Sequence, residues 1–564
     1  MAKQILTTTQ GENLAATPWQ VYPRPQMQRG SWLNLNGQWE FTASREESIP
    51  SRYDRGILVP FAPESRLSGI GEHFPEGSFL YYRKQFRADP TQNGRFLLHF
   101  GAVSQYAKIY VNQTLAKTHR GSYEAFCFDI THLLREDNEL VVQVRSNLDD
   151  PTMPYGKNVK KPGGMWYTPV TGLWQTVWAE WVPQIHIETL DIQVTLSSAT
   201  ISVTPALDGQ VTVEGKTYAM THGKAVVTPE NPKLWTPESP YLYRFTLTAG
   251  EDTVESYFAL RTLEIQEIAG LSRLCLNGKP YFFHGLLDQG YWPDGLLTPA
   301  SPECYAQDIL SMKELGFNTL RKHIKVEPEQ FYYDCDRLGM VVFQDMVNNG
   351  DYNFLRDTVF PTFFRQRKDD RKMHRDANAR QAFLEGMEAT VRQLKNHPSI
   401  CYWTIFNEGW GQFDGTAAYE RLKKLDSSRF VDSASGWFRG CRSDVESLHI
   451  YFGCWFRMKK FPKPVVLSEF GGFAYSVEGH IYNPDKVYGY GTCKSAEELD
   501  KKLQALYEKH VIPQVKNGLC AAIYTQVSDV EDEINGLVTY DRKVTKVNRD
   551  TMVRIAEALQ KELN

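Results

Sequence analysis

Several features that mark whole classes of protein are missing from this chain of 564 residues. It has no run of eighteen apolar residues, and its first twenty residues lack the apolar stretch of a signal peptide. Its net charge of −4 provides no basic surface for nucleic acid or anionic lipid. These absences predict a cytoplasmic protein with neither a nucleic acid nor a membrane as partner.

Cysteine and histidine motifs are missing as well. The nine cysteines are scattered, odd in number and never spaced as CxxC: Cys127, Cys275, Cys304, Cys335, Cys401, Cys441, Cys454, Cys493 and Cys520. Such a pattern is typical of reduced, mostly buried thiols rather than of disulfides or a zinc site. HxH, HExxH and EF-hand spacings do not occur either. We therefore expect no cofactor and no required metal, while the sequence leaves a structural or site metal open.

The first half of the chain consists of short alternating apolar and polar runs. The chain is too long for one core, and its 13% aromatic content suits many strands with stacking surfaces. Residues 1–183 show almost no helical periodicity, which predicts a jelly-roll-like β-sandwich. Residues 184–263 form a second all-strand segment of a length suited to a seven-stranded immunoglobulin-like sandwich. The proline-rich stretch 227–243 within it is predicted to be a crossover between strands.

From residue 264 to residue 564, apolar strands alternate with amphipathic helices. Eight candidate strands occur: "PYFFHGLL", "FNTLRKH", "MVVFQDM", "ICYWTIFNE", "RFVDSAS", "ESLHIYFG", "PVVLSEFGG" and "LCAAIYTQVSD". Helical patterns between them include residues 301–316, 327–339, 378–397 and 495–518. Eight strand–helix units in about 300 residues predict a (β/α)8 barrel, so the chain is expected to be multidomain.

Two carboxylates stand out at the ends of the predicted barrel strands, where such barrels place their chemistry. Glu408 ends an apolar strand directly after Asn407, and Glu469 follows "KPVVLS". A single glutamate at a strand end could equally be a solvated charge or the partner of a helix N-terminus. These two end the fourth and seventh strands, which barrel closure brings across one mouth. A facing pair about 5 Å apart is the geometry of retaining glycoside hydrolysis.

The motifs "FNEGW" and "LSEFGG" resemble the acid/base and nucleophile motifs of family 2 glycoside hydrolases, which include β-galactosidases, β-glucuronidases and β-mannosidases. Nearly the whole chain shares the resemblance, since "GLWQTVWAEWV" is similar to that family's N-terminal sugar-binding sandwich and "LNGKPYFFHG" to its join into the barrel. The resemblance implies that Glu408 is the general acid/base and Glu469 the nucleophile. It also implies that Asn407 binds the sugar 2-hydroxyl and that Arg321 keeps the pKa of Glu469 low.

Other polar and aromatic residues near the strand ends are candidates for substrate binding, each with a structural alternative. His323 and His449 are expected in the site, although lone histidines are often satisfied core residues. Tyr451 is placed to hydrogen-bond the nucleophile or to serve as a buried structural tyrosine. We expect Trp410 and Trp437 either to stack on sugar faces or to pack in the protein. The remaining residues are Trp403, expected in the core, and Asp288 and Glu531, further substrate-binding candidates.

Specificity is expected to reside in the loops after the strands. The loop "LLDQGYWPDGLLTP" resembles that of β-mannosidases and exo-glucosaminidases, and its Trp292 and Asp294 are expected to shape the pocket for the terminal sugar. The last loop lacks the Asn-x-Lys that β-glucuronidases use on the sugar carboxylate, because Leu537 stands at the lysine position. Lys322 and Lys325 remain as cations for an acidic sugar or as solvated rim residues.

These observations predict a retaining exo-β-glycosidase, with a β-galactoside as the first expected substrate. A β-glucuronide, β-galacturonide or β-mannoside is the alternative. A rival of another class is a carbohydrate-binding protein on a hydrolase scaffold, although a binder would not need two opposed acids. A transglycosylase would share the covalent intermediate. The expected partner is a small glycoside or oligosaccharide, and a homo-oligomer is left open.

Overall fold

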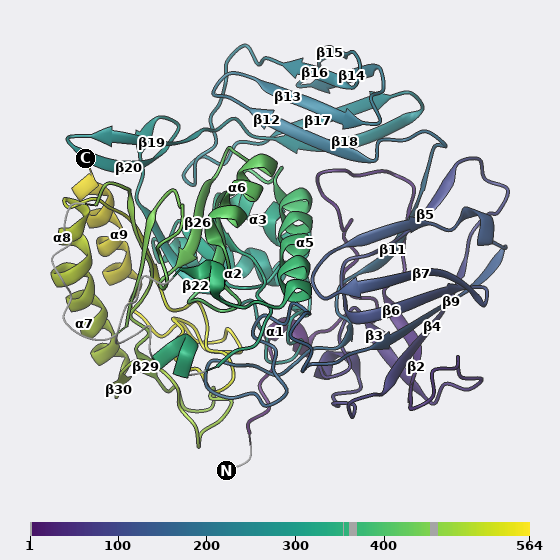
Figure 1. Cartoon of the computed structure of the whole chain (residues 1–564), viewed down its shortest axis with the longest axis horizontal. Helices are drawn as coiled ribbons and strands as arrows, with labels where there is room; N and C mark the ends of the chain where they lie inside the picture. Colours follow the sequence, from purple (N-terminus) through teal and green to yellow (C-terminus); the bar gives the residue numbers. More distant parts are fainter. Residues whose placement is uncertain (1–2, 354, 360–368, 452–460, 564) are drawn as a thin grey trace.

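The computed structural model describes residues 3–353, 355–359, 369–451 and 461–563 of the chain. Two β-sandwiches lie against a barrel of parallel strands, as the sequence predicts (Figure 1). The N-terminal sandwich is on the right of Figure 1, the second sandwich at the top and the barrel at the lower left. Within the described ranges, no helix has both the length and the apolar character needed to cross a bilayer.

The N-terminal sandwich has two antiparallel sheets around one apolar core. Alternation makes the strands: in β2, Trp39 and Phe41 are buried while Gln38 and Glu40 are exposed. The first sheet has the order β1-β11-β5-β8 and the second β10-β6-β9-β4-β2-β3, with β7 paired to β6. The strands are β1 Trp32–Asn34, β2 Gly37–Ser44, β3 Arg55–Val59, β4 Phe79–Arg87, β5 Arg95–Phe100, β6 Val103–Val111, β7 Thr114–Gly121, β8 Phe126–Asp129, β9 Asp137–Arg145, β10 Gly172–Leu173 and β11 Val177–Val182.

The second sandwich has seven strands in sheets of three and four, which confirms the immunoglobulin-like prediction. The sheets have the orders β12-β13-β16 and β15-β14-β17-β18. The expected crossover at residues 227–243 joins β16 in one sheet to β17 in the other. The strands are β12 Thr189–Val194, β13 Ala199–Thr204, β14 Gly209–Val213, β15 Lys216–Met220, β16 Lys224–Val227, β17 Tyr243–Ala249 and β18 Asp252–Phe258.

The barrel contains all eight predicted strands in parallel, in the order β26-β25-β24-β23-β22-β31-β28-β27. They are β22 Phe283–Asp288, β23 Thr319–Lys322, β24 Val341–Asp345, β25 Ile400–Asn407, β26 Phe430–Ser435, β27 Glu446–Ile450, β28 Val465–Phe470 and β31 Leu519–Tyr524. In the described part of the chain, no ladder joins β26 to β27. The hydroxyls of Ser435 and Ser447, 3.2 Å apart, bridge these two strands and nearly close the barrel.

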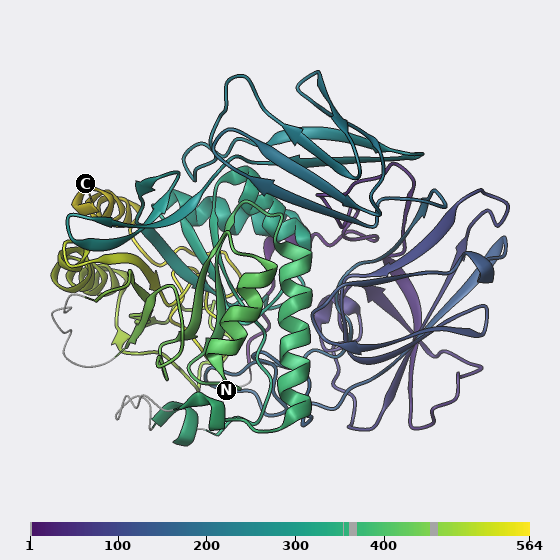
Figure 2. The same ribbon diagram turned by 45° about the horizontal axis from the view of Figure 1, so that its top comes forward.

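Helices surround the barrel. They are α2 Glu303–Glu314, α3 Glu329–Leu338, α5 Ala377–Leu394, α6 Gly415–Leu425, α7 Ala496–Leu506, α8 Ile512–Val515 and α9 Arg549–Leu563. Helix α5 lies between the barrel strands and the N-terminal sandwich in both views (Figures 1 and 2). A small sheet that was not predicted, β19 Leu263–Ile268, β20 Leu271–Leu276 and β21 Lys279–Pro280, precedes the first barrel strand. Short elements are α1 Thr9–Glu12, β29 Ala474–Tyr475 and β30 Thr492–Cys493.

The three parts are joined by buried polar contacts. Arg29 binds Asp252 of β18 at 2.7 Å and Glu180 of β11 at 3.2 Å, so one guanidinium links both sandwiches. The loop between β9 and β10 extends from the N-terminal sandwich to the barrel, where Thr168 N donates to Glu531 Oε1 at 2.8 Å. The exact limits expected from the sequence, 1–183, 184–263 and 264–564, stay a prediction.

The cysteines are thiols, as predicted. The eight that the structure describes are free, with Cys127 exposed, Cys441 half-buried and the other six buried. Cys454 lies outside the described residues.

Candidate active site

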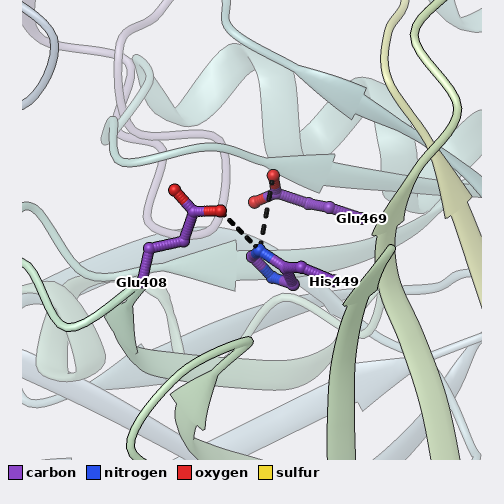
Figure 3. A group of neighbouring side chains, drawn as sticks. All are labelled: Glu408, His449 and Glu469. Carbon is purple, nitrogen blue, oxygen red and sulfur yellow. Dashed lines mark hydrogen bonds and ion pairs between the residues drawn. The ribbon is translucent and has the colours of Figure 1, made fainter. Parts of the chain in front are cut away.

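Glu408 and Glu469 meet at the barrel mouth. One carboxylate oxygen of each, together with Nδ1 of His449, forms a group of atoms that all lie within 4.8 Å of one another. Figure 3 shows both carboxylates directed at the His449 ring. Retaining glycosidases hold their carboxyl groups about 5 Å apart, whereas inverting ones need room for a water molecule and hold them at about 6.5 Å or more. The observed spacing fits the retaining arrangement. The three atoms are also close enough to share a metal ion, so independence from metal stays a prediction.

The backbone at Glu408 is held in an unusual conformation. Glu408 has φ of 50°, which is uncommon for a residue with a side chain, and its N–H donates to Ser435 O of β26 at 2.9 Å. Gly409 follows at φ of 75°, and a Cβ there would lie 2.5 Å from the Phe438 ring. The sequence Asn407-Glu408-Gly409 thus turns the chain sharply at the end of β25, which presents the Glu408 side chain at the mouth.

Arg321 of β23 organises the base of the site. Its Nη1 donates to Glu469 Oε1 at 3.0 Å, its Nε to Asp345 Oδ1 at 3.0 Å and its Nη2 to Asn407 Oδ1 at 2.8 Å. The guanidinium is 1% exposed. A rigid fork of donors fixes the position of each acceptor, so Arg321 sets the relative placement of Glu469 and Asn407. The structure thus places Arg321 against Glu469, and its role as a site residue stays a prediction.

His449 and Tyr451 also contact the pair, as their strand-end position suggested. His449 Nδ1 lies 2.8 Å from Glu408 Oε1 and 3.6 Å from Glu469 Oε2, while its Nε2 contacts Ser435 Oγ at 3.0 Å. The Tyr451 hydroxyl donates to Glu469 Oε2. His323 does not reach Glu469 directly; its Nδ1 lies 2.8 Å from Asp345 Oδ2, and burial lowers its pKa. His323 therefore orients Asp345, which in turn holds Arg321.

The surroundings of Glu469 favour its ionised form. Burial alone would raise the pKa of this carboxyl. Nearby groups outweigh burial and lower the pKa of Glu469 to about 2. They are His449, Arg321 and His323, which interact with the carboxylate through their charge, and Tyr451, which donates a hydrogen bond to it. Glu469 is therefore a carboxylate at any pH near neutrality, which is the state that a nucleophile requires.

Tyr451→Phe tests this cause. Removing the hydroxyl takes a donor from a charged acceptor, so kcat should fall about 10- to 100-fold. Because the remaining carboxylate is less stabilised, the pKa of Glu469 rises and the acid limb of kcat/KM moves to higher pH. The measurement is a pH–rate profile of both proteins, with Tyr419→Phe on α6 as control. A loss of kcat with an unmoved acid limb would mean that Tyr451 acts in some other way.

The tryptophans differ in their placement. Trp403 is fully buried and its Nε1 donates to Asp426 Oδ2 at 2.8 Å, so it is a core residue as expected. Trp410 is 1% exposed and stacks on Trp166 at 5.0 Å, which favours the packing alternative. Trp437 is half-buried, 5.8 Å from the His449 ring, and its Nε1 has no hydrogen-bond partner among the described residues. Of the two loop indoles, Trp437 is the one placed to meet a sugar.

Trp292 and Asp294 correct the expectation that they shape the sugar pocket. Asp294 Oδ2 accepts hydrogen bonds from Thr8 N at 2.8 Å and Thr8 Oγ1 at 2.6 Å. Trp292 is 2% exposed beneath the Arg542 guanidinium, which lies 4.0 Å from its ring. The loop after β22 is covered by the N-terminal segment and by the loop after β31, contacts between distant parts of the chain that the local sequence does not reveal.

Asp294→Ala should therefore reduce stability and leave specificity unchanged. The Thr8 N–H and hydroxyl lose their buried acceptor, which costs about 1–3 kcal/mol of unfolding free energy. Thermal unfolding and kcat/KM for two epimeric nitrophenyl sugars are the measurements, with the exposed Asp137→Ala as control. A changed ratio between the epimers at unchanged stability would restore Asp294 to the sugar pocket.

A buried charge cluster contains Asp288, Lys322 and Lys325. It corrects the expectations that Asp288 binds substrate and that the two lysines either bind an acidic sugar or lie in solvent at the rim. Lys322 Nζ contacts Asp288 Oδ2 at 2.6 Å and Glu327 Oε1 at 2.9 Å. Lys325 Nζ contacts Glu327 Oε2 at 2.8 Å and donates to the carbonyls of Gly290 and Leu297. Both lysines are 1% exposed, so they are not solvated rim residues. Their carboxylate partners neutralise the positive charge that an acidic sugar would need.

Glu531, expected to bind substrate, instead contacts another part of the protein. It is 4% exposed, and its Oε1 accepts the Thr168 N–H of the sandwich loop. The same loop brings Lys157 and Trp166 to the mouth, and Tyr167 donates to Glu533 Oε2 at 2.5 Å. Sequence reasoning missed these residues, because "YGKNVKKPGGMWYTP" carries only the signal of a glycine- and proline-rich loop. The structure therefore gives Glu531 a contact with the sandwich rather than with the carboxylate pair.

Two β-sandwiches followed by a (β/α)8 barrel with opposed carboxylates at its mouth are the architecture of multidomain glycoside hydrolases. The chain belongs to family 2 of the glycosyl hydrolases: the TIM barrel domain of that family matches residues 267–555, more than half of the chain. The galactose-binding domain-like part of the family matches residues 76–163. A third domain, described simply as glycosyl hydrolases family 2, matches residues 184–261.

Individual relatives are distant. A β-galactosidase of Thermoanaerobacter pseudethanolicus is 26% identical over 493 residues, which are 80% of this chain and 59% of that protein. A β-glucuronidase of Felis catus is 24% identical over 590 residues, covering 86% of this chain and 83% of that protein. The solved β-D-glucuronidase of Dictyoglomus thermophilum superposes with a TM-score of 0.73 at 18% identity, covering 95% and 98% of the two chains. At that identity the structural likeness establishes the fold alone.

Proposed function

We propose that this protein is a retaining exo-β-glycosidase that removes a terminal sugar by double displacement. The observation that carries the proposal is the spacing of Glu408 and Glu469, within 4.8 Å, with Arg321 bound to Glu469. Glu469 attacks the anomeric carbon while Glu408 gives its proton to the departing oxygen, so the glycosidic bond breaks as the glycosyl–enzyme bond forms. Glu408 then takes a proton from water, whose oxygen displaces Glu469.

Asn407 supports this chemistry from the same turn. Its Oδ1 accepts the Arg321 bond, which leaves the amide nitrogen as a donor for a substrate oxygen. A donor beside the nucleophile suits the sugar 2-hydroxyl, whose hydrogen bond strengthens as the transition state develops. The expected role of Asn407 is thus part of the proposal.

The sugar itself is the open part of the assignment. A β-galactoside was the first expectation, and some relatives are β-galactosidases, while others are β-glucuronidases. The residues expected to read the hydroxyls of a neutral sugar, Trp292 and Asp294, contact other parts of the protein. A cytoplasmic location and any homo-oligomeric state also stay predictions.

A panel of nitrophenyl glycosides tests the function: galactose, glucose, mannose, glucuronate, galacturonate, arabinose and galactofuranose. Nitrophenol release from at least one β-glycoside is expected. A folded protein that releases none would favour the carbohydrate-binding alternative. Product analysis with an added alcohol acceptor separates hydrolysis from transglycosylation.

A further inference from the structure

Lys157 enters the barrel mouth from the N-terminal sandwich. It lies in the loop between β9 and β10 and is 5% exposed. Its Nζ lies 4.7 Å from the centre of the Trp410 ring and 5.6 Å from that of Trp166. Trp410 is two residues beyond Glu408, and both Glu469 and Glu408 interact electrostatically with the ammonium group, although Lys157 comes from another part of the fold.

Five other cations around the barrel mouth, all within the described part of the chain, already have carboxylate partners. Arg321 binds Asp345 and Glu469, Lys322 binds Asp288 and Glu327, Lys325 binds Glu327, Arg542 binds Asp308, and Lys546 binds Asp529. The Lys157 Nζ, by contrast, makes no hydrogen bond or ion pair with any residue in the described ranges and has only the two indole faces. A buried ammonium group without a partner is unfavourable unless a bound molecule supplies the missing negative charge.

Glu533 is the protein carboxylate with the largest influence on Lys157, and its oxygens are already used. Oε2 accepts from Tyr167 and Oε1 from Asn535 Nδ2 at 3.1 Å. Burial raises the pKa of Glu533, which favours its neutral form, and burial lowers the pKa of Lys157. An anionic ligand group would therefore be the natural partner for the ammonium.

Of the two proposed catalytic carboxylates, Glu469 interacts more strongly with the Lys157 charge than Glu408 does. The same charge acts on His323, which belongs to the group of side chains around the proposed nucleophile. In a hexopyranose, C5 and the anomeric carbon are bonded to the same ring oxygen. A carboxylate on C5 of a sugar attacked by Glu469 would thus lie close to the nucleophile, where a cation is required to bind it.

We propose that Lys157 is the specificity-determining residue that binds the carboxylate of the glycone, and that the substrates are β-glycosides of a hexuronic acid. This assignment rests on the proposed glycosidase function and deepens it. The indoles of Trp166 and Trp410 hold the ammonium in place and exclude water, which strengthens its interaction with an anion. The Asn-x-Lys missing from the last loop is replaced by a lysine from the sandwich.

Paired substrates that differ only at C6 test the proposal: nitrophenyl β-galacturonide against β-galactoside, and β-glucuronide against β-glucoside. The wild-type protein should prefer one of the uronides to its neutral partner. Lys157→Met should lower kcat/KM for that uronide by about 100-fold or more, because a buried charge pair loses one member. The neutral sugar should be little affected. Lys157→Arg should retain part of the preference, and Lys160→Met, on an exposed lysine of the same loop, should match the wild type.

Preference for a neutral sugar by the wild type, or equal losses on both members of a pair in Lys157→Met, would overturn the role of Lys157. Calorimetric titration with free galacturonate, glucuronate, galactose and glucose separates this failure from failure of the proposed function. If no glycoside is hydrolysed, the glycosidase proposal fails. Tighter binding of a uronate than of its neutral sugar, lost in Lys157→Met, would still support the cation's role. Equal binding by both proteins would reject it.

Discussion

Replacing Glu469 with Gln is expected to abolish the release of every nitrophenyl sugar, with kcat reduced by about 10⁴-fold or more. The amide is nearly the same size but cannot form the covalent bond to the anomeric carbon. Since the first chemical step itself is lost, a better leaving group should not restore activity. Steady-state and single-turnover kinetics with nitrophenyl and dinitrophenyl sugars are the measurements.

Two controls separate this effect from misfolding. Arg321 retains Asp345 as a partner in the variant, so the thermal transition should remain cooperative. Glu136→Gln, on a glutamate whose side chain is 74% exposed, should leave kcat unchanged. Substantial turnover by Glu469→Gln would show that the nucleophile is another group.

Glu408→Ala is expected to give a different pattern that depends on the leaving group. Dinitrophenolate departs without a proton, so formation of the glycosyl–enzyme should continue with such substrates. Alkyl glycosides need proton delivery and should lose about 10²- to 10⁴-fold in kcat/KM. Hydrolysis of the intermediate also slows, because the general base that activates water is absent.

Azide provides the matched test of Glu408. The small anion fits the space left by the side chain and attacks the intermediate without a general base, so turnover should recover and a β-glycosyl azide should form. The same addition should have no effect on Glu469→Gln. Equal losses on all leaving groups, with no response to azide, would contradict the assignment of Glu408.

The local parts of this structure are readable from the sequence. Each barrel strand is a short apolar run, such as residues 400–407, that ends in polar residues, and this pattern identifies both strand and mouth. The two key carboxylates follow such strands, so barrel closure places them together. Their surroundings at Arg321, Asn407 and Tyr451 follow from the same reasoning, since all of them occupy strand ends.

The parts that sequence reasoning missed depend on contacts between distant segments. The residue type and loop position of Asp294 are typical of a pocket residue, but its hydrogen-bond partner is Thr8, 286 positions earlier in the chain. A lysine such as Lys322 is usually a surface residue, but here it forms ion pairs with Asp288 and Glu327 inside the protein. Lys157 lies in a loop of the sandwich, and only the packing of the sandwich on the barrel brings it beside Trp410.

Trapping the covalent intermediate tests the central claim most directly. A 2-deoxy-2-fluoro glycoside of the best sugar in the panel, with a dinitrophenyl leaving group, slows both steps but lets the first occur. Intact-mass spectrometry followed by peptide mapping should find one glycosyl group attached to Glu469. Attachment to Glu408 or to any other side chain, or product released with inverted anomeric configuration and no adduct, would contradict the account.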